Sequence, residues 1–219
     1  MDRTRLIDQL LSHFNIFRIH RFPRSSIRSA RRILHQKDLS MQIKSRWNRR
    51  AKEQSIEDIA GALGFISWKI ATNAVLELEN QGYQTDSNAH RLEIIGEFLA
   101  FLLQVADRLA FVKMETGERQ RFITALAKHI VDTFVDNQRD VLGEGEHQKA
   151  FIDLLNQRAE DYAGLSFDDG EAGFDFRRFF GERVAAVMRE KHFVSQQVMD
   201  IEGPDAIKTF KKAMRDLFK

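Results

Sequence analysis

The feature that most constrains the fold is a long stretch without proline. Proline occurs only at Pro23 and Pro204, so residues 24–203 lack the residue type that interrupts helices most strongly. Within this stretch, apolar residues recur at the three- and four-residue spacing of amphipathic helices. No alternating pattern of useful length indicates a strand. The sequence therefore predicts an all-α fold, a single-domain bundle of about six to seven amphipathic helices.

Capping residues divide this stretch into helices. Ser55 and Asp58 have the spacing of a capping box, and Gly82 is typical of the left-handed residue that ends a helix. The predicted apolar stripes run from Ile59 to Leu78, Leu92 to Leu109, Phe122 to Phe134, Phe151 to Tyr162, Phe176 to Met188 and Ile207 to Leu217. A short helical segment is expected from Phe193 to Ile201, and Gly203-Pro204 is expected to open the last helix.

Charge is distributed very unevenly along the chain. Residues 1–52 contain 14 Lys and Arg against three Asp, whereas residues 53–219 contain 20 Lys and Arg against 29 Asp and Glu. Such asymmetry indicates a basic N-terminal segment, 1–52, and a helical bundle domain, 53–219. Hydrophobic residues at 43% and charged residues at 30% are ordinary for a globular protein, and the absence of cysteine fits a cytoplasmic location.

Three explanations compete for residues 1–40, which are rich in Arg and Ser. They form a basic arm that contacts nucleic acid or another acidic partner, or a transit peptide, or a leader upstream of a true start at Met41. The third is favoured because Lys37-Asp38 can be encoded by a purine-rich string at a ribosome-binding distance from Met41.

The most apolar stretch, Ile94 to Val112, is long enough to span a bilayer. It contains Glu97, Asp107 and Arg108, and such a charge near the membrane centre costs about 2.5–3.5 kcal/mol. We therefore expect a buried central helix of a soluble bundle and no membrane contact.

Residues 55–82 resemble the helix-turn-helix motif of bacterial DNA-binding regulators. In that motif Gly64 would make the turn and Ser67 would cap a recognition helix. The resemblance implies that the residues entering the major groove are Trp68, Lys69, Thr72 and Asn73.

The same residues also fit one or two amphipathic helices packed in a bundle, with Gly61 and Gly64 permitting close approach. Lys69 is the only basic residue between Lys52 and Arg91, whereas phosphate contacts normally need several. DNA binding is therefore the alternative function, and nucleic acid the less favoured partner.

Patterns that would indicate an enzyme are weak. Glu144 and His147 have the Glu-x-x-His spacing of di-iron bundles, but no second pair occurs. The acidic loop at residues 168–171 lacks the ligand order of a calcium-binding loop. We predict no catalytic residue, no metal ligand and no cofactor, which favours a non-enzymatic protein.

The chain has 18 phenylalanines but only two tyrosines. Phe176, Phe179 and Phe180 share one helix face, which predicts either a heavy aromatic core or a subunit interface. The favoured function is a cytoplasmic helical protein that acts through protein–protein contacts, as a homo-oligomer and with a protein partner not identified by the residues.

Overall fold

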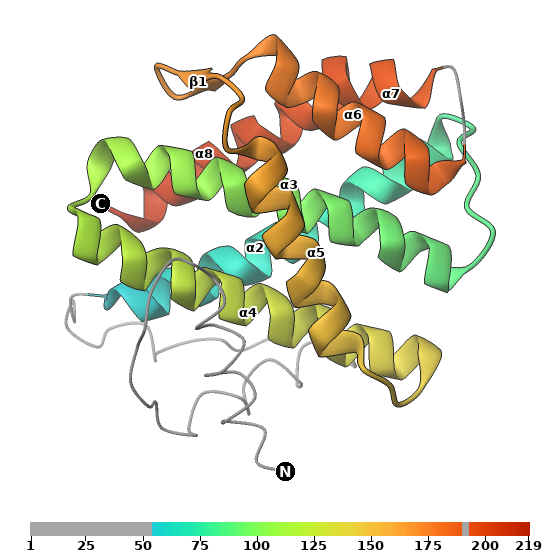
Figure 1. Ribbon diagram of the computed structural model, residues 1–219, viewed down its shortest axis with the longest axis horizontal. Helices are drawn as coiled ribbons and strands as arrows, with labels where there is room; N and C mark the ends of the chain where they lie inside the picture. Colours follow the sequence, from blue (N-terminus) through green and yellow to red (C-terminus); the bar gives the residue numbers. More distant parts are fainter. Residues whose placement is uncertain (1–53, 190–192) are drawn as a thin grey trace, which may run out of the picture. The chain divides into compact units, whose positions relative to one another are not determined.

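The computed structural model describes residues 54–189 and 193–219, of which residues from Ser55 onward form one compact unit (Figure 1). Its elements are α2 (Ile56–Asn80), α3 (Asn88–Lys113), α4 (Thr116–Leu142), α5 (His147–Tyr162), β1 (Phe167–Asp168), β2 (Glu171–Ala172), α6 (Phe174–Met188), α7 (Val194–Gln197), the π-helix η2 (Val198–Glu202) and α8 (Gly203–Leu217). The predicted all-α, single-domain bundle is confirmed. The basic segment 1–52 lies outside the described residues, and so do residues 1–40 with their three explanations.

The predicted capping signals are formed. The hydroxyl of Ser55 accepts a hydrogen bond from the Asp58 amide at 3.1 Å, and the Asp58 carboxylate accepts one from the Ser55 amide. Gly82 adopts φ +94°, and the Tyr83 amide donates to the Leu78 carbonyl beyond the end of α2. These contacts satisfy backbone groups that the helix ends would otherwise leave unpaired.

Helix α3 is the centre of the bundle and packs against α2, α4, α5, α6 and α8 (Figure 1). Every residue from 94 to 103 is buried, which confirms the expected central helix. In the described part of the chain, one helix, α2, is long and apolar enough to cross a membrane, judged by length and composition alone. Half of the window that meets this criterion is buried within the fold.

One ion pair crosses this interior. Arg158 of α5 donates two hydrogen bonds to the Glu97 carboxylate of α3, at 2.6 and 2.8 Å, and a third to Asp161 at 3.0 Å. Both side chains of the Glu97–Arg158 pair are less than 10% exposed. The bond to Glu97 raises the pKa of Arg158, and burial raises the pKa of the adjacent Tyr162 hydroxyl. The charged form of a group so far from water depends on its partner.

Helices α2 and α4 make the closest crossing. A Cβ atom added to Gly64 would lie 2.8 Å from Cβ of His129, and one added to Gly61 would lie 3.1 Å from Nε2 of the same ring. Burial and the neighbouring charge of Lys128 lower the pKa of His129. The glycines therefore serve close helix approach, one of the two interpretations of this segment.

The C-terminal helices form one continuous path from α7 through η2 into α8, with right-handed helical backbone at both junctions. Helix α8 begins at Gly203, as expected, but it continues directly from η2. Only the hydrogen-bond pattern changes at this point. Pro204 has no amide hydrogen to continue the α pattern, and the Gly203 amide donates to the Val198 carbonyl instead.

Candidate functional site

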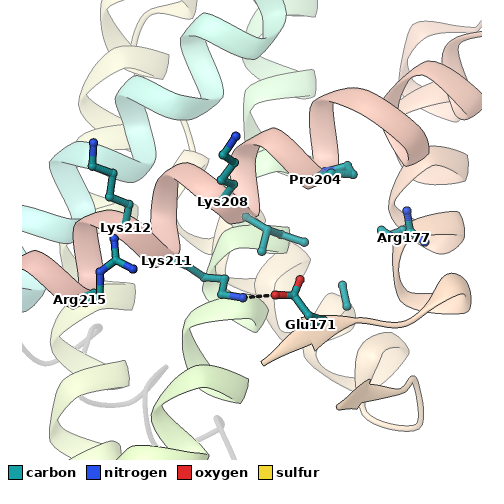
Figure 2. A pocket seen from close by; sticks show the side chains of 9 residues that line it. Glu171, Arg177, Pro204, Lys208, Lys211, Lys212 and Arg215 are labelled. Atoms are coloured by element: carbon teal, nitrogen blue, oxygen red, sulfur yellow. Dashed lines mark hydrogen bonds and ion pairs between the residues drawn. The ribbon is translucent and has the colours of Figure 1, made fainter. Parts of the chain in front are cut away.

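An open groove of about 730 Å³ lies beside α8, between that helix, the start of α6 and the β1–β2 hairpin (Figure 2). Apolar side chains from α8 and β2 form part of its lining. Its charged residues are Arg177, Lys208, Lys211, Lys212, Arg215 and Glu171. Five cations against one acid make this groove strongly basic.

The fold of α8 explains why its cations gather there. Ala206, Ile207, Phe210 and Met214 are buried against the bundle, which fixes the opposite face toward solvent. Residues 208, 211, 212 and 215 occupy i, i+3, i+4 and i+7 positions, so they lie on one stripe about 10 Å long. A carboxylate- or phosphate-bearing ligand laid along the helix can meet all four cations.

Most of these cations are unmatched. Lys211 pairs with Glu171 of β2, the contact drawn as a dashed line in Figure 2. Lys208, Lys212 and Arg215 form no ion pair within residues 54–189 and 193–219. Asp216, the acid next to Arg215, instead pairs with Lys219 at 2.9 Å. The groove therefore carries positive charge that no acid among the described residues neutralises.

This surface was missed by sequence reasoning because charge was counted over whole segments. The domain from residue 53 is acidic in total, and this sum conceals a C-terminal helix with four cations and two acids. The signal available was the helical spacing of those cations opposite an apolar stripe.

The predicted helix-turn-helix is wrong. Helix α2 runs without interruption through Gly64 and Ser67. Ser67 is fully buried and its hydroxyl donates to the Leu63 carbonyl at 2.8 Å, so it does not cap a second helix. The physical reason is that Gly64 is needed for contact with α4, a segment far away in the sequence.

The four predicted DNA-contacting residues consequently lie along the outer half of one helix. Lys69 and Asn73 are exposed, whereas Trp68 and Thr72 are partly buried, and the Thr72 hydroxyl donates to the Trp68 carbonyl. Without the turn these residues are not presented as a recognition helix. Nucleic acid as the less favoured partner stays a prediction.

The predicted self-association face is also corrected. Phe176 and Phe180 are fully buried, and Phe180 stacks on Phe101 of α3 with ring centroids 3.9 Å apart. Phe179 is partly buried and packs edge-on to Tyr162 at 5.0 Å. Phe176 and Phe180 belong to the core of the monomer, because α6 places both rings against Phe101 of α3, and Phe179 packs on α5. Self-association by other residues stays a prediction.

The residues considered for metal binding do not converge. The His147 ring contacts the Gly143 carbonyl at 2.8 Å, while Glu144 lies 3.7 Å from Arg139. Residues 168–171 form the tip of the β1–β2 hairpin. Within the described ranges, no group of three or more His, Asp or Glu side chains could hold a metal ion.

One further buried carboxyl group lies at the junction of η2 and α8. Burial raises the pKa of Glu202, although Gln197 and Gln81 donate hydrogen bonds to it at 3.2 and 3.3 Å. Gln81 caps the end of α2 and Gln197 is the last residue of α7, so this carboxyl group connects the C-terminal ends of the two helices.

Comparisons with protein-family models, curated proteins and solved structures found no match to this chain.

Proposed function

We propose that this protein is a non-enzymatic binding protein that acts through protein–protein contacts, and that the groove beside α8 receives an acidic segment of its partner. The observation that carries the proposal is the stripe of Lys208, Lys212 and Arg215, which has no neutralising acid among the described residues. Unmatched charge of one sign attracts a partner of the opposite sign and speeds their encounter.

A protein segment fits the groove better than a nucleic acid backbone does. Glu171 already places a carboxylate on Lys211, so the groove accommodates that group (Figure 2). Pro204 and Ile207 add apolar surface, which side chains of a peptide can cover. The spacing of the four cations on α8 matches carboxylates at the same spacing on a facing helix.

The expected affinity is modest. An exposed ion pair contributes about 0.2–1 kcal/mol, and added salt weakens it. A few such pairs give a weak, rapidly exchanging complex unless apolar contacts add to them. This partner contact would therefore be transient and sensitive to ionic strength.

The test uses the full chain and a fluorescein-labelled helical peptide of about twelve residues with glutamates at i, i+3, i+4 and i+7. Fluorescence anisotropy at low salt measures its dissociation constant. We expect Lys208→Glu/Lys212→Glu to weaken binding roughly tenfold, because two attractive contacts become repulsive.

A charge-matched control separates the groove from the overall charge of the chain, including its basic segment. Lys69→Glu/Lys149→Glu makes the same change in net charge on α2 and on α5, and neither residue lines the groove. This control should weaken binding by less than about threefold. Equal losses in both variants, or no loss in either, would contradict the proposal. Tighter binding of a duplex DNA through the same two lysines would replace the protein partner with nucleic acid.

The cytoplasmic location, the homo-oligomeric state and the absence of a cofactor stay predictions. Each is independent of the groove.

A further inference from the structure

The β1–β2 hairpin places one acid inside the basic groove. Phe167 pairs with Ala172 and Asp168 with Glu171 across the two strands. Asp169 and Gly170 connect them with φ of +52° and +78°, the tight turn typical of an Asp-Gly hairpin. This register directs Glu171 to Lys211, as Figure 2 shows.

We infer that Glu171 is an internal stand-in for a partner carboxylate, and that the acidic partner binds by replacing Glu171 on Lys211. The inference rests on the proposed function and names how that same site is regulated. The hairpin then sets the affinity of the groove, because every partner molecule competes with a carboxylate of the chain itself.

The position of Lys211 supports this exchange. It lies between Lys208 and Arg215 on the cationic stripe, so a ligand that spans the stripe must pass it. Its side chain is 32% exposed, whereas that of Glu171 is 71% exposed. An ion pair with one side chain so accessible contributes little to stability and is replaced readily by another carboxylate.

The hairpin does not depend on this ion pair for its place. The Phe167 ring packs against Phe176 with centroids 5.3 Å apart. The Gly173 amide donates to the Ser166 carbonyl at 3.0 Å, which closes the base of the hairpin. Glu171 can therefore turn into solvent while the backbone around it stays in position.

The test is Glu171→Gln in the full chain, with the same glutamate-rich peptide and the same anisotropy measurement. Removing the internal competitor should tighten binding about three- to tenfold. Asp168→Asn is the matched control, because it removes one negative charge from the same hairpin without an ion pair. It should change the affinity by less than about twofold.

A double-mutant cycle identifies the competition itself. In a Lys211→Met background, Glu171→Gln should leave the dissociation constant unchanged, because the contested cation is gone. Equal tightening by Glu171→Gln and Asp168→Asn would overturn the inference and indicate general electrostatics. Weaker binding by Glu171→Gln would also overturn it, since Glu171 would then contact the partner directly.

The two proposals fail differently. If Lys208→Glu/Lys212→Glu leaves peptide binding unchanged, the groove is not the binding site and the proposed function fails. If that variant weakens binding but Glu171→Gln does not tighten it, only the inference about the hairpin fails. Thermal unfolding of each variant checks that the fold is retained.

Discussion

Charged residues have opposite roles in the interior around α3 and on the outer face of α8. Glu97 and Arg158 are buried and matched by two short hydrogen bonds, so neither charge is available to a ligand. Lys208, Lys212 and Arg215 are exposed and unmatched within the described residues. The buried charges therefore maintain the fold, whereas the unpaired charges on α8 are accessible to a ligand.

The largest effect is expected from breaking the buried pair. Arg158→Met leaves the Glu97 carboxylate buried without its partner, which should lower the free energy of unfolding by about 3–5 kcal/mol. Urea denaturation followed by circular dichroism measures the loss.

The double variant Glu97→Leu/Arg158→Met is the control. Removing both charges from the same site should restore most of the stability, because no uncompensated ion remains. If Arg158→Met alone lowers the free energy of unfolding no more than a surface substitution does, the Glu97–Arg158 pair does not maintain the fold.

A smaller loss is expected where α2 crosses α4. Gly64→Ala would place a methyl group 2.8 Å from Cβ of His129. The clash costs about 1–3 kcal/mol, and alanine's better helix propensity recovers about 0.5–1 kcal/mol of that. Gly117→Ala in α4, where a Cβ meets nothing within 4 Å, should instead be neutral or stabilising. If both substitutions change the thermal unfolding temperature equally, α2 and α4 do not pack closely at Gly64.

The same crossing predicts a pH dependence of stability. Burial lowers the pKa of His129 below its usual 6.5, so the unfolded chain binds more protons as the pH falls through that range. This contribution is fully present above pH 6.5 and is lost as the pH drops toward the lowered pKa. His129→Gln should reduce the slope of the free energy of unfolding against pH between pH 7.5 and 5, relative to the parent. The reduction should correspond to at most about one bound proton. An unchanged slope would mean that the ring is not desolvated.

The smallest effect belongs to the outer face of α8. Lys208→Ala/Lys212→Ala should change the free energy of unfolding by no more than about 0.5 kcal/mol, since exposed side chains away from caps and cores contribute little. A large loss in the same urea assay would show that these lysines maintain the fold.

Local signals in the sequence predicted much of this fold. The Ser55–Asp58 capping box, the Gly82 helix end and the buried apolar stretch of α3 all depend on residues near one another in the chain. The prediction of a turn at Gly64 was wrong, because glycine fits both a turn and a close helix crossing. Only the position of α4 decides between them. For Phe176 and Phe180 the core interpretation is confirmed and the interface interpretation is corrected. An aromatic face predicts burial but does not say whether α3 or a second subunit covers it.

The groove needed the tertiary structure as well. Helical spacing places the four cations on one face of α8, but Arg177 and Glu171 join them only because α6 and the hairpin fold beside that face. Because Glu171 and Arg177 lie about 30 residues or more before the α8 cations in the chain, the sequence alone did not group these six residues.

Backbone amide chemical shifts test whether the basic face of α8 is a binding surface. The glutamate-rich peptide would be titrated into the ¹⁵N-labelled full chain at low salt, with two-dimensional ¹H–¹⁵N spectra recorded at each step. We predict that the largest shift changes fall in residues 171–177 and 204–217, and that added salt reverses them. Largest changes in residues 1–52 or along α2 would contradict the account.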